Sequence, residues 1–587
     1  GLMWRFSHSV VMPHHFNRVY VSWQEERLLD YVPEVMLVDP AGRYDATVGG
    51  FKSGLPADGG LPGPADLPWS AWTNTLAFWI PLVLLVMVAG ICLAIVVHGQ
   101  WARRERLRYP VAEFAAELIP DGGERAGLSA VLRNRLFWLG FVSVAAILLI
   151  NGYQHSYNRE SIQIPLHIDF MPVAQKWPAL ASVPYYQKLF QPRVYFAVVG
   201  LAYFVSTDVS LSLGLSHVFY ALGFMALTVH GVDMQEQYLT GGVQDFQLFG
   251  AFAGAGLILL YIGRRYYGDL AAAVVGLKAG DRIGGTVRWA ARAALLCAAS
   301  MVAILVIGVR LHWLLAVLFV LLAGLAFVIV ARLNAETGLF FIQAGWQPVG
   351  VLLALFGHSA LGANMLIVLA LLSGVITIDP RVCMMPMAAN ALRLGEAKSV
   401  RPAGVGGWMI AALLVSLAVT LPVSMWIQYG WGAGDLYGSA TEMSKLPFKA
   451  LLGHLTQYGG DPGRWQSFRI GLFDPETRFL WAAGIGLGLV LLFGAMRLRF
   501  TWWPLHPVLF MVWGTYPAVR MASSFLLGWA LKVAITRLSG GRGYQRAKPL
   551  FVGLVAGTFI AAILLALAGL GHYLATGVSG GRYNVNP

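Results

Sequence analysis

An all-α, polytopic bundle of transmembrane helices is the fold that this sequence predicts, and two observations predict it. Of the 587 residues, 57% are hydrophobic and only 12% are charged, whereas a soluble domain carries about 25% charged residues. The apolar residues also gather into runs of about 20, which are long enough to cross a bilayer core of about 30 Å as helices. Helices are expected because every backbone group in lipid needs a hydrogen-bond partner within the chain.

The hydrophobic pattern divides the chain into about fourteen apolar segments. They are 75–98, 136–152, 193–207, 210–229, 246–262, 290–309, 312–331, 338–356, 364–378, 406–428, 478–496, 503–517, 520–536 and 549–572. We expect four regions: an extracytoplasmic N-terminal segment at 1–74, a first transmembrane half at 75–309, a second half at 312–572 and an extracytoplasmic tail at 573–587.

Basic residues collect in alternate connections, and this predicts the orientation of the chain. Lys and Arg favour cytoplasmic loops of membrane proteins, which also accounts for the formal net charge of +13 without nucleic acid as a partner. The basic loops are 99–135, 263–289, 379–405 and 537–548. The long segments 1–74, 153–192 and 429–477 then fall outside, together with the C-terminus. The sequence therefore predicts a multi-pass protein of the bacterial inner (plasma) membrane.

Two proline-containing stretches indicate an internal repeat. Pro110 in "RYPVAEFAAELI" and Pro386 in "MMPMAANALRL" are 276 residues apart, and each follows an apolar span within a basic loop. A shift of that size lays 246–262 near 520–536, and the matching crossings have the same orientation. Parallel repeats of this kind are common in secondary transporters.

The repeat leaves one part of the second half unmatched. The hairpin 312–356 has no counterpart in the first half, because the segment 1–74 stands where that counterpart would end. We therefore expect two halves of eight spans, the first of them truncated, with two more spans upstream of Gly1.

Four stretches carry a resemblance to a known type of protein: "WARRERLRYPVAEFAAELI", "YFVSTDVSLSLGLS", "ARLNAETG" and "FTWWPLHPVLFMVWGTYP". They resemble an uncharacterised bacterial and archaeal multi-pass membrane family that is distantly similar to oligopeptide (OPT-type) transporters. The resemblance covers nearly the whole chain. It implies spans built from duplicated halves and the proton-coupled import of small peptides or metal chelates. The NPG and KIPPR-type motifs of OPT proteins are not found here, so no binding residue is transferred.

The stretch "VIVARLNAETGLFFIQAGW" places charge between two apolar runs. Arg332, Asn334, Glu336 and Thr337 lie within six residues, and Glu336 is the only acid between residues 282 and 378. One interpretation is a solvated cytoplasmic turn. The other is a broken helix folded into the bundle, where ionisable groups usually mark a transport or proton pathway. We expect Glu336 to be buried against Arg332 or another cation and to exchange a proton.

Two further polar interruptions supply candidate residues. Asp208 interrupts the apolar residues 194–229 among serines and a threonine, and His217 follows nine residues later. The proline-rich stretch "TWWPLHPVLFMVWGTYPAVRMASS" contains His506, Tyr516 and Arg520. Interrupted helices at corresponding places in two halves point to a transport site. Asp208 can equally be a turn residue, and His217 a packing residue.

The expected function is a proton-coupled secondary transporter that is not an enzyme and needs no cofactor or metal. No Walker, HExxH, GxSxG or GxGxxG context is present, and the three cysteines form no CxxC pair. The partners would be membrane lipid, a small-molecule or peptide substrate, and either a second copy of the chain or a larger membrane complex. One alternative is a scaffold or accessory subunit that does not transport. The other is a membrane redox subunit, because His217 and His230 are 13 residues apart.

Overall fold

The computed structural model describes residues 2–585 apart from short gaps. The gaps are 41, 56–61, 121–128, 158–159, 178–179, 182, 233, 235–238, 278–282, 340–341, 379–381, 435, 437, 462–465, 579–580, 582 and 584. Part of the predicted tail 573–587 therefore lies outside the described residues. Within the described part every regular element is a helix, and only His167 and Arg193 form an isolated β-bridge. The all-α class is confirmed.

Ten helices in the described residues are long and apolar enough to cross a membrane, and they mark the chain as a membrane protein. They are α4 (Trp69–His98), α6 (Arg135–Ser156), α10 (Thr207–Val229), α11 (Val243–Ile262), α13 (Gly285–Gly308), α14 (Trp313–Thr337), α16 (His358–Ile376), α18 (Pro402–Trp431), α20 (Thr477–Arg499) and α22 (Tyr516–Thr576).

Shorter helices fill the connections between the long ones. They are α1 (Leu2–Val19), α2 (Val21–Glu25), α3 (Gly50–Ser53), α5 (Pro110–Leu118), α7 (Met171–Ala174), α8 (Gln187–Phe190), α9 (Phe196–Phe204), α12 (Arg264–Val275), α15 (Pro348–Phe356), α17 (Met385–Ala397), α19 (Gly438–Tyr458) and α21 (Val508–Val512). Single turns of 3₁₀- or π-helix occur at Leu28–Tyr31, Glu34–Met36, Asp45–Gly49, Gly99–Arg104, Ala130–Arg133 and Ile470–Leu472.

The structure does not confirm fourteen full helical spans, and helix length is the reason. The apolar segments 193–207, 338–356 and 503–517 contain only the short helices α9, α15 and α21. A helix of nine residues rises only about 14 Å, roughly half of the bilayer core. Apolar composition predicted these segments as spans, but it could not show where the helix would break.

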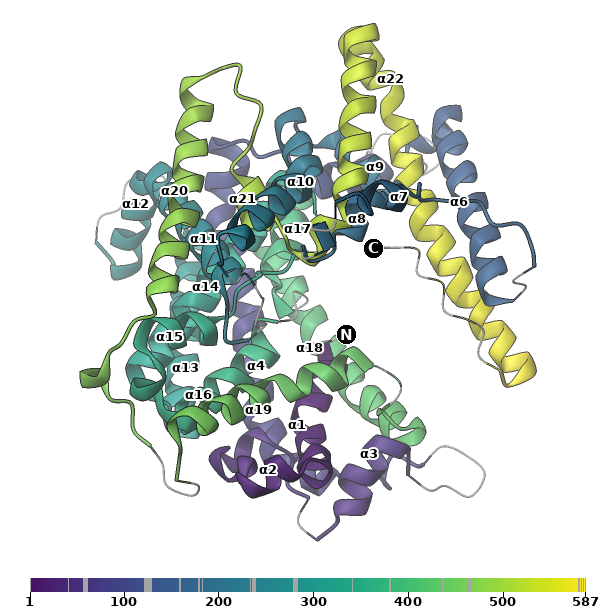
Figure 1. Ribbon diagram of the computed structural model, residues 1–587. Coiled ribbons are helices and arrows are strands. Elements are labelled where there is room, and N and C mark those ends of the chain that lie inside the picture. The colour runs from purple at the N-terminus through teal and green to yellow at the C-terminus, as the bar shows by residue number, and fades with distance from the viewer. Residues whose placement is uncertain are drawn as a thin grey trace.

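Helix α22 contains two of the predicted segments, 520–536 and 549–572. Gly540 separates them with φ 60° and ψ −158°, a backbone conformation outside the helical region. Glycine adopts a positive φ at little steric cost. The two arms fold back at this point (Figure 1), and the short helix α9 packs against both, with Gly528 close to Ala202 and Gly200 close to Val555.

Helices α1, α2, α3 and α19 form a layer at one end of the molecule, at the bottom of Figure 1. These helices belong to the segments 1–74 and 429–477, which the sequence places on the same side. Trp23 stacks on Phe448 with ring centroids 4.9 Å apart, and the His8 ring lies 3.0 Å from the carbonyl oxygen of Ala433. These two long segments therefore fold into one layer over the ends of the spans.

The opposite end carries the basic connections, and ion pairs join them to each other. Arg103 lies 2.7 Å from Glu396 of α17. Lys548, in α22 beyond the bend, lies 2.9 Å from Glu113 and 2.7 Å from Glu117 of α5. Three loops that the sequence predicts on a common side are thus in direct contact.

Apolar side chains build two main cores between these ends. One lies among α1, α4, α14, α16 and α19 and includes the fully buried Trp72 and Phe448. The other lies among α11, α14, α17, α20, α21 and α22 and includes Phe252 and Trp346. The second core surrounds the charged residues described next.

Candidate functional site

Arg332 is the centre of a largely but not fully buried ion-pair group at the basic end of α14. Its guanidinium Nε lies 2.6 Å from Glu336 one turn later, and its Nη1 donates to Glu105. The side chains of these three residues are between 11% and 19% exposed. The guanidinium also lies over the Trp101 ring, 5.4 Å from the ring centroid. The expected pair of Arg332 with Glu336 is present, and Glu105 is an additional carboxylate partner.

A solvated loop at Arg332 would require α14 to end there, but the helix does not end at this residue. It continues to Thr337 and ends at Gly338, whose φ of 66° is the left-handed conformation of a helix C-terminus. Two polar contacts hold this end in place. The Asn334 amide donates to the carbonyl oxygen of Leu339 at 2.6 Å, and the amide of Asn390 on α17 donates to Asn334 at 2.6 Å.

Thr337 and the neighbouring helix α5 complete this support. The Thr337 hydroxyl donates to the carbonyl of Leu333 and accepts from the backbone N–H of Leu339. The backbone N–H of Tyr109, just before α5, donates to the carbonyl of Ala335 at 3.0 Å. The last turn of α14 is therefore enclosed by α5 and α17, each of which has a proline in its first turn.

The chain beyond Gly338 crosses back through the protein largely without helix. The Phe468 ring contacts both His312, where α14 begins, and Phe356, where α15 ends, at centroid distances of 5.0 and 5.1 Å. The segment 338–356 therefore returns to the end of the molecule from which α14 started. Only its last nine residues are helical, and the described residues before them form neither helix nor strand.

Non-helical backbone at membrane depth occurs only where protein or a water-filled cavity surrounds it. Here protein surrounds it, because Leu339, Ala344 and Trp346 are all at least 93% buried. Trp346 packs edge-on against Phe249 and Phe252 of α11. This interrupted crossing begins directly at the ion-pair group of Arg332.

Asp208 and His506 join the same region from other helices. Asp208, in the first turn of α10, lies 2.7 Å from Arg497 at the end of α20. The backbone N–H of His506 donates to Ser212 Oγ at 2.7 Å, and His506 is only 6% exposed. His506 is close enough to interact electrostatically with Glu336, Asp208, Arg497 and Arg332. Four of the predicted site residues therefore lie in one region, within electrostatic range of His506.

Lys532 is a residue of this region that the sequence analysis did not select. It lies inside the first arm of α22, is 5% exposed and donates to the carbonyl oxygen of Val205, at the C-terminus of α9. A cation is favourable at the negative end of a helix dipole. Asp208 is within electrostatic range. A lysine within an apolar span is a signal that could have identified it.

The other three predicted residues lie elsewhere. His217 is nine residues beyond Asp208, about 14 Å along α10, and its Nε2 lies 3.2 Å from the carbonyl oxygen of Tyr185. The Tyr185 ring contacts Tyr516, and the Arg520 guanidinium lies 4.7 Å from the centre of the Tyr516 ring. The proline-rich stretch thus does not form one site, because α21 and its flanking turns separate His506 from Tyr516 and Arg520.

A polar cavity of about 490 Å³ opens near the end where α15 meets α16. Its wall includes His358, Asp474, Glu476 and Arg478, together with the start of α11. The His358 ring lies 3.0 Å from the His454 ring, measured between their Nδ1 atoms. Burial, and then the neighbouring His358, lower the pKa of His454 to about 4. Acids and bases line this cavity, so it suits a solute that carries both charges.

The described residues contain no group of three or more His, Cys, Asp or Glu side chains that could hold a metal ion. The three cysteines are buried and unpaired with one another. The chemistry of the candidate site is therefore that of paired acids and bases, and the arrangement can bind charge or exchange protons.

Comparison with known proteins gives a family and no activity. The chain belongs to the family of unknown function DUF6785, whose model matches residues 1–576. No curated protein matches the sequence.

Proposed function

We propose that this member of the DUF6785 family is a secondary transporter that moves a small polar solute together with protons. The interrupted crossing 338–356 is the observation that carries the proposal, because it starts at the buried charges of Arg332, Glu105 and Glu336. Discontinuous helices near mid-membrane form the substrate and ion sites of many transporters. Buried ionisable groups in such places mark ion pathways and proton relays.

The proton-coupling part rests on the cluster of Glu336, His506 and Asp208. A histidine between two carboxylates and two arginines can change its charge when a neighbouring group moves, which is what a relay needs. Glu336 is the acid nearest the break in the chain, so a rearrangement of residues 338–347 would alter its pairing with Arg332. A proton on Glu336 would compensate for that change.

The substrate class follows from the resemblance to OPT-type transporters and from the polar cavity. Small peptides carry a positive and a negative end, and a metal chelate carries carboxylates. The cavity walls offer Arg478 to an anionic group and Asp474 or Glu476 to a cationic one. We infer that a solute enters there and reaches the interrupted crossing, since Leu353 and Ala354 of that crossing line the cavity.

Two packing relations support the internal repeat. Pro110 and Pro386 each lie in the first turn of a short helix, α5 and α17, beside the end of α14. The repeat pairs α9 with α20 and α11 with the first arm of α22. The paired helices pack across the two halves. Helix α9 of the first half packs on α22 of the second, and α20 of the second half packs on α11 of the first. Two intertwined halves would place interrupted helices face to face.

Orientation and location are part of the proposal. The connected basic loops would face the cytoplasm of a bacterial cell, since Lys and Arg determine the cytoplasmic side. The layer of α1 and α19 and the polar cavity would then face outward. Single cysteines at Arg125 and Gly471, labelled in intact cells with an impermeant reagent, test this. We expect labelling at residue 471 only, and labelling at residue 125 alone would reverse the orientation.

Proton-coupled uptake into vesicles tests the function itself. The purified protein is reconstituted into liposomes that contain a pH-sensitive dye, and di- and tripeptides or chelated metal ions are added outside. We expect solute-dependent acidification in the wild type and its loss in Glu336→Gln. The matched control is Glu442→Gln, which removes a carboxylate from an exposed ion pair with Lys445.

The outcomes separate the alternatives. Uptake that continues in Glu336→Gln with the same pH dependence contradicts the coupling role of Glu336. An absence of flux for every solute in wild-type vesicles contradicts transport of this class and favours the scaffold or accessory subunit. A Soret absorbance band in the purified protein favours the redox subunit instead.

A further inference from the structure

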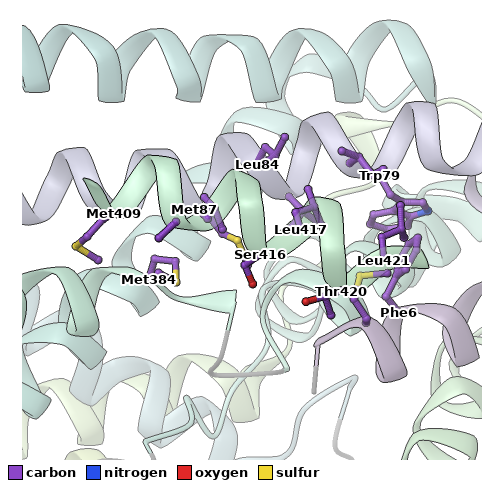
Figure 2. A pocket seen from close by; sticks show the side chains of 15 residues that line it. Phe6, Trp79, Leu84, Met87, Met384, Met409, Ser416, Leu417, Thr420 and Leu421 are labelled. Carbon is purple, nitrogen blue, oxygen red and sulfur yellow. The ribbon is translucent and has the colours of Figure 1, made fainter. Parts of the chain in front are cut away.

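A second cavity, of about 420 Å³, lies between α4 and α18 and is almost entirely apolar. Figure 2 shows its wall, with Trp79 and Met87 from α4 facing Leu417 and Leu421 from α18. Only the hydroxyl groups of Ser416 and Thr420 interrupt the apolar lining of this cavity. The lining contains none of the residues of the charged cluster, so the cavity is a separate site.

The position of the cavity on α18 shows which medium surrounds it. Met409, Leu413, Ser416 and Thr420 face the cavity at intervals of three and four residues, which is one stripe of a helix. The opposite stripe includes Val415, which is 65% exposed in the middle of an apolar span. The cavity-facing residues Ala412, Ser416 and Thr420 are exposed as well, so the cavity is a groove that opens to the hydrocarbon of the bilayer.

An apolar space of this kind favours hydrocarbon over water. Apolar cavities do not retain water, because water finds no hydrogen-bond partners there. Serine and threonine in a helix can bond to the backbone carbonyl four residues earlier, so their hydroxyls need no polar partner from a ligand. The thioethers of Met3, Met87 and Met409 line the cavity, and flexible methionines adapt to the shape of an irregular apolar occupant.

The two ends of the cavity differ, and this difference gives the occupant a direction. At one end Met3 and Phe6 of α1 close it, with the Phe6 ring against Trp79 at 6.0 Å between centroids. At the other end lies Met409, and Arg401 stands exposed at the start of α18, eight residues earlier and about 12 Å farther along the helix. A basic side chain at the membrane surface attracts an anionic headgroup.

We propose that this cavity binds one acyl chain of an anionic phospholipid, with the headgroup at the basic end near Arg401. The chain lies between α4 and α18 and ends against Met3 and Phe6. It fills the space between two helices that approach each other little, and it thereby couples α18 to the bundle. The site is independent of the proposed transport activity.

Photo-crosslinking tests the acyl-chain site. The protein is reconstituted into vesicles of phosphatidylethanolamine and phosphatidylglycerol that contain a trace of phosphatidylglycerol with a diazirine in mid-chain. Mass spectrometry then locates the label after irradiation. We expect labels on α4 and on the stripe of α18 that contains Ser416. Ala412→Trp, which fills the cavity, should lower this labelling about tenfold, the equivalent of about two buried methylene groups.

A control variant on the same helix makes the result specific. Ala418→Trp adds the same side chain to α18 outside the cavity lining, and labelling of the cavity should stay as in the wild type. If both variants have the same melting temperature in detergent, the difference in labelling does not come from misfolding of one of them. Equal labelling around all faces of α18, or a cavity signal that Ala412→Trp leaves unchanged, would overturn the proposal.

The headgroup preference has its own test. With a diazirine-bearing phosphatidylethanolamine in place of phosphatidylglycerol, we expect weaker labelling of the cavity. Arg401→Gln should reduce the preference for phosphatidylglycerol about fivefold, the contribution of one basic residue near an anionic surface. Equal labelling by both lipids in the wild type would contradict the anionic headgroup, and labelling that survives only with free fatty acid would contradict a phospholipid.

Discussion

Helices α11 and α20 touch through their backbones, whereas α4 and α18 stand far enough apart to leave a cavity. A Cβ atom added to Gly250 of α11 would lie 1.9 Å from the carbonyl oxygen of Ala483, and one added to Gly486 would lie 1.9 Å from that of Gln247. Between α4 and α18 the lining consists of large side chains such as Trp79 and Leu417. Small residues allow helices to approach in lipid, where the hydrophobic effect does not drive association.

The difference has a functional meaning. The close pair α11 and α20 belongs to the part of the bundle that holds Trp346 and the buried charges, and charges in a membrane need rigid, complete pairing. The open pair holds no charge and can exchange one apolar occupant for another. Rigid packing therefore accompanies the candidate site, and loose packing accompanies the proposed lipid site. Substitutions in the two regions should differ accordingly.

The largest effect is expected for Gly250→Ala. The new methyl group would overlap the backbone of Ala483, and neither helix can move without breaking its partner contacts. We expect a loss in the free energy of unfolding on the order of 4–5 kcal/mol, measured by thermal unfolding in detergent. Gly484→Ala is the control, because its Cβ meets nothing within 4 Å. Equal melting temperatures for both variants would show that α11 and α20 are not in backbone contact.

Glu336→Gln should have the next largest effect. Removing one partner of a buried ion pair leaves an uncompensated charge and costs about 3–5 kcal/mol. We expect the lower end of that range, because Arg332 keeps Glu105 as a partner. The double variant Glu105→Gln, Glu336→Gln should therefore lose more than the sum of the two single losses, and simple additivity would contradict a shared arginine.

A pH dependence is expected from the layer that contains α19. Burial lowers the pKa of His454 from 6.5 to about 4, so the unfolded chain binds a proton more readily than the folded protein. The stability contribution is fully present above pH 6.5 and is lost as the pH falls toward about 4. We expect a loss of about 2 kcal/mol, allowing for solvent screening. The melting temperature of His454→Gln should decrease less than that of the wild type between pH 6.5 and pH 4. The same decrease in both proteins would contradict this.

The smallest effect is expected for Val419→Ala on the exposed face of α18. The side chain is 58% exposed, and lipid replaces the missing methyl groups. We expect a change within about 0.5 kcal/mol and an unchanged oligomeric state in detergent, measured by thermal unfolding and light scattering. A larger loss, or dissociation of an oligomer, would mean that this face contacts a second copy of the chain instead of lipid.

Local pattern was sufficient for part of the candidate site. Arg332 and Glu336 are four residues apart, the spacing at which helix side chains meet, and their place between apolar runs indicated burial. The partner of Asp208 could not be predicted, because Arg497 is 289 residues away and the sequence spacing carries no information about their contact. The separation of His506 from Tyr516 and Arg520 could not be predicted, because it depends on α21 and its flanking turns, which lie between them.

By itself the sequence determined the all-α class, the apolar segments and one ion pair. These follow from composition and helix period, which are properties of neighbouring residues. Only the tertiary structure decided where helices break and which charges meet. Glu105 reaches Arg332, Lys532 caps α9, and α9 contacts both arms of α22. Desolvation and backbone approach depend on elements hundreds of residues apart, so no local pattern can specify them.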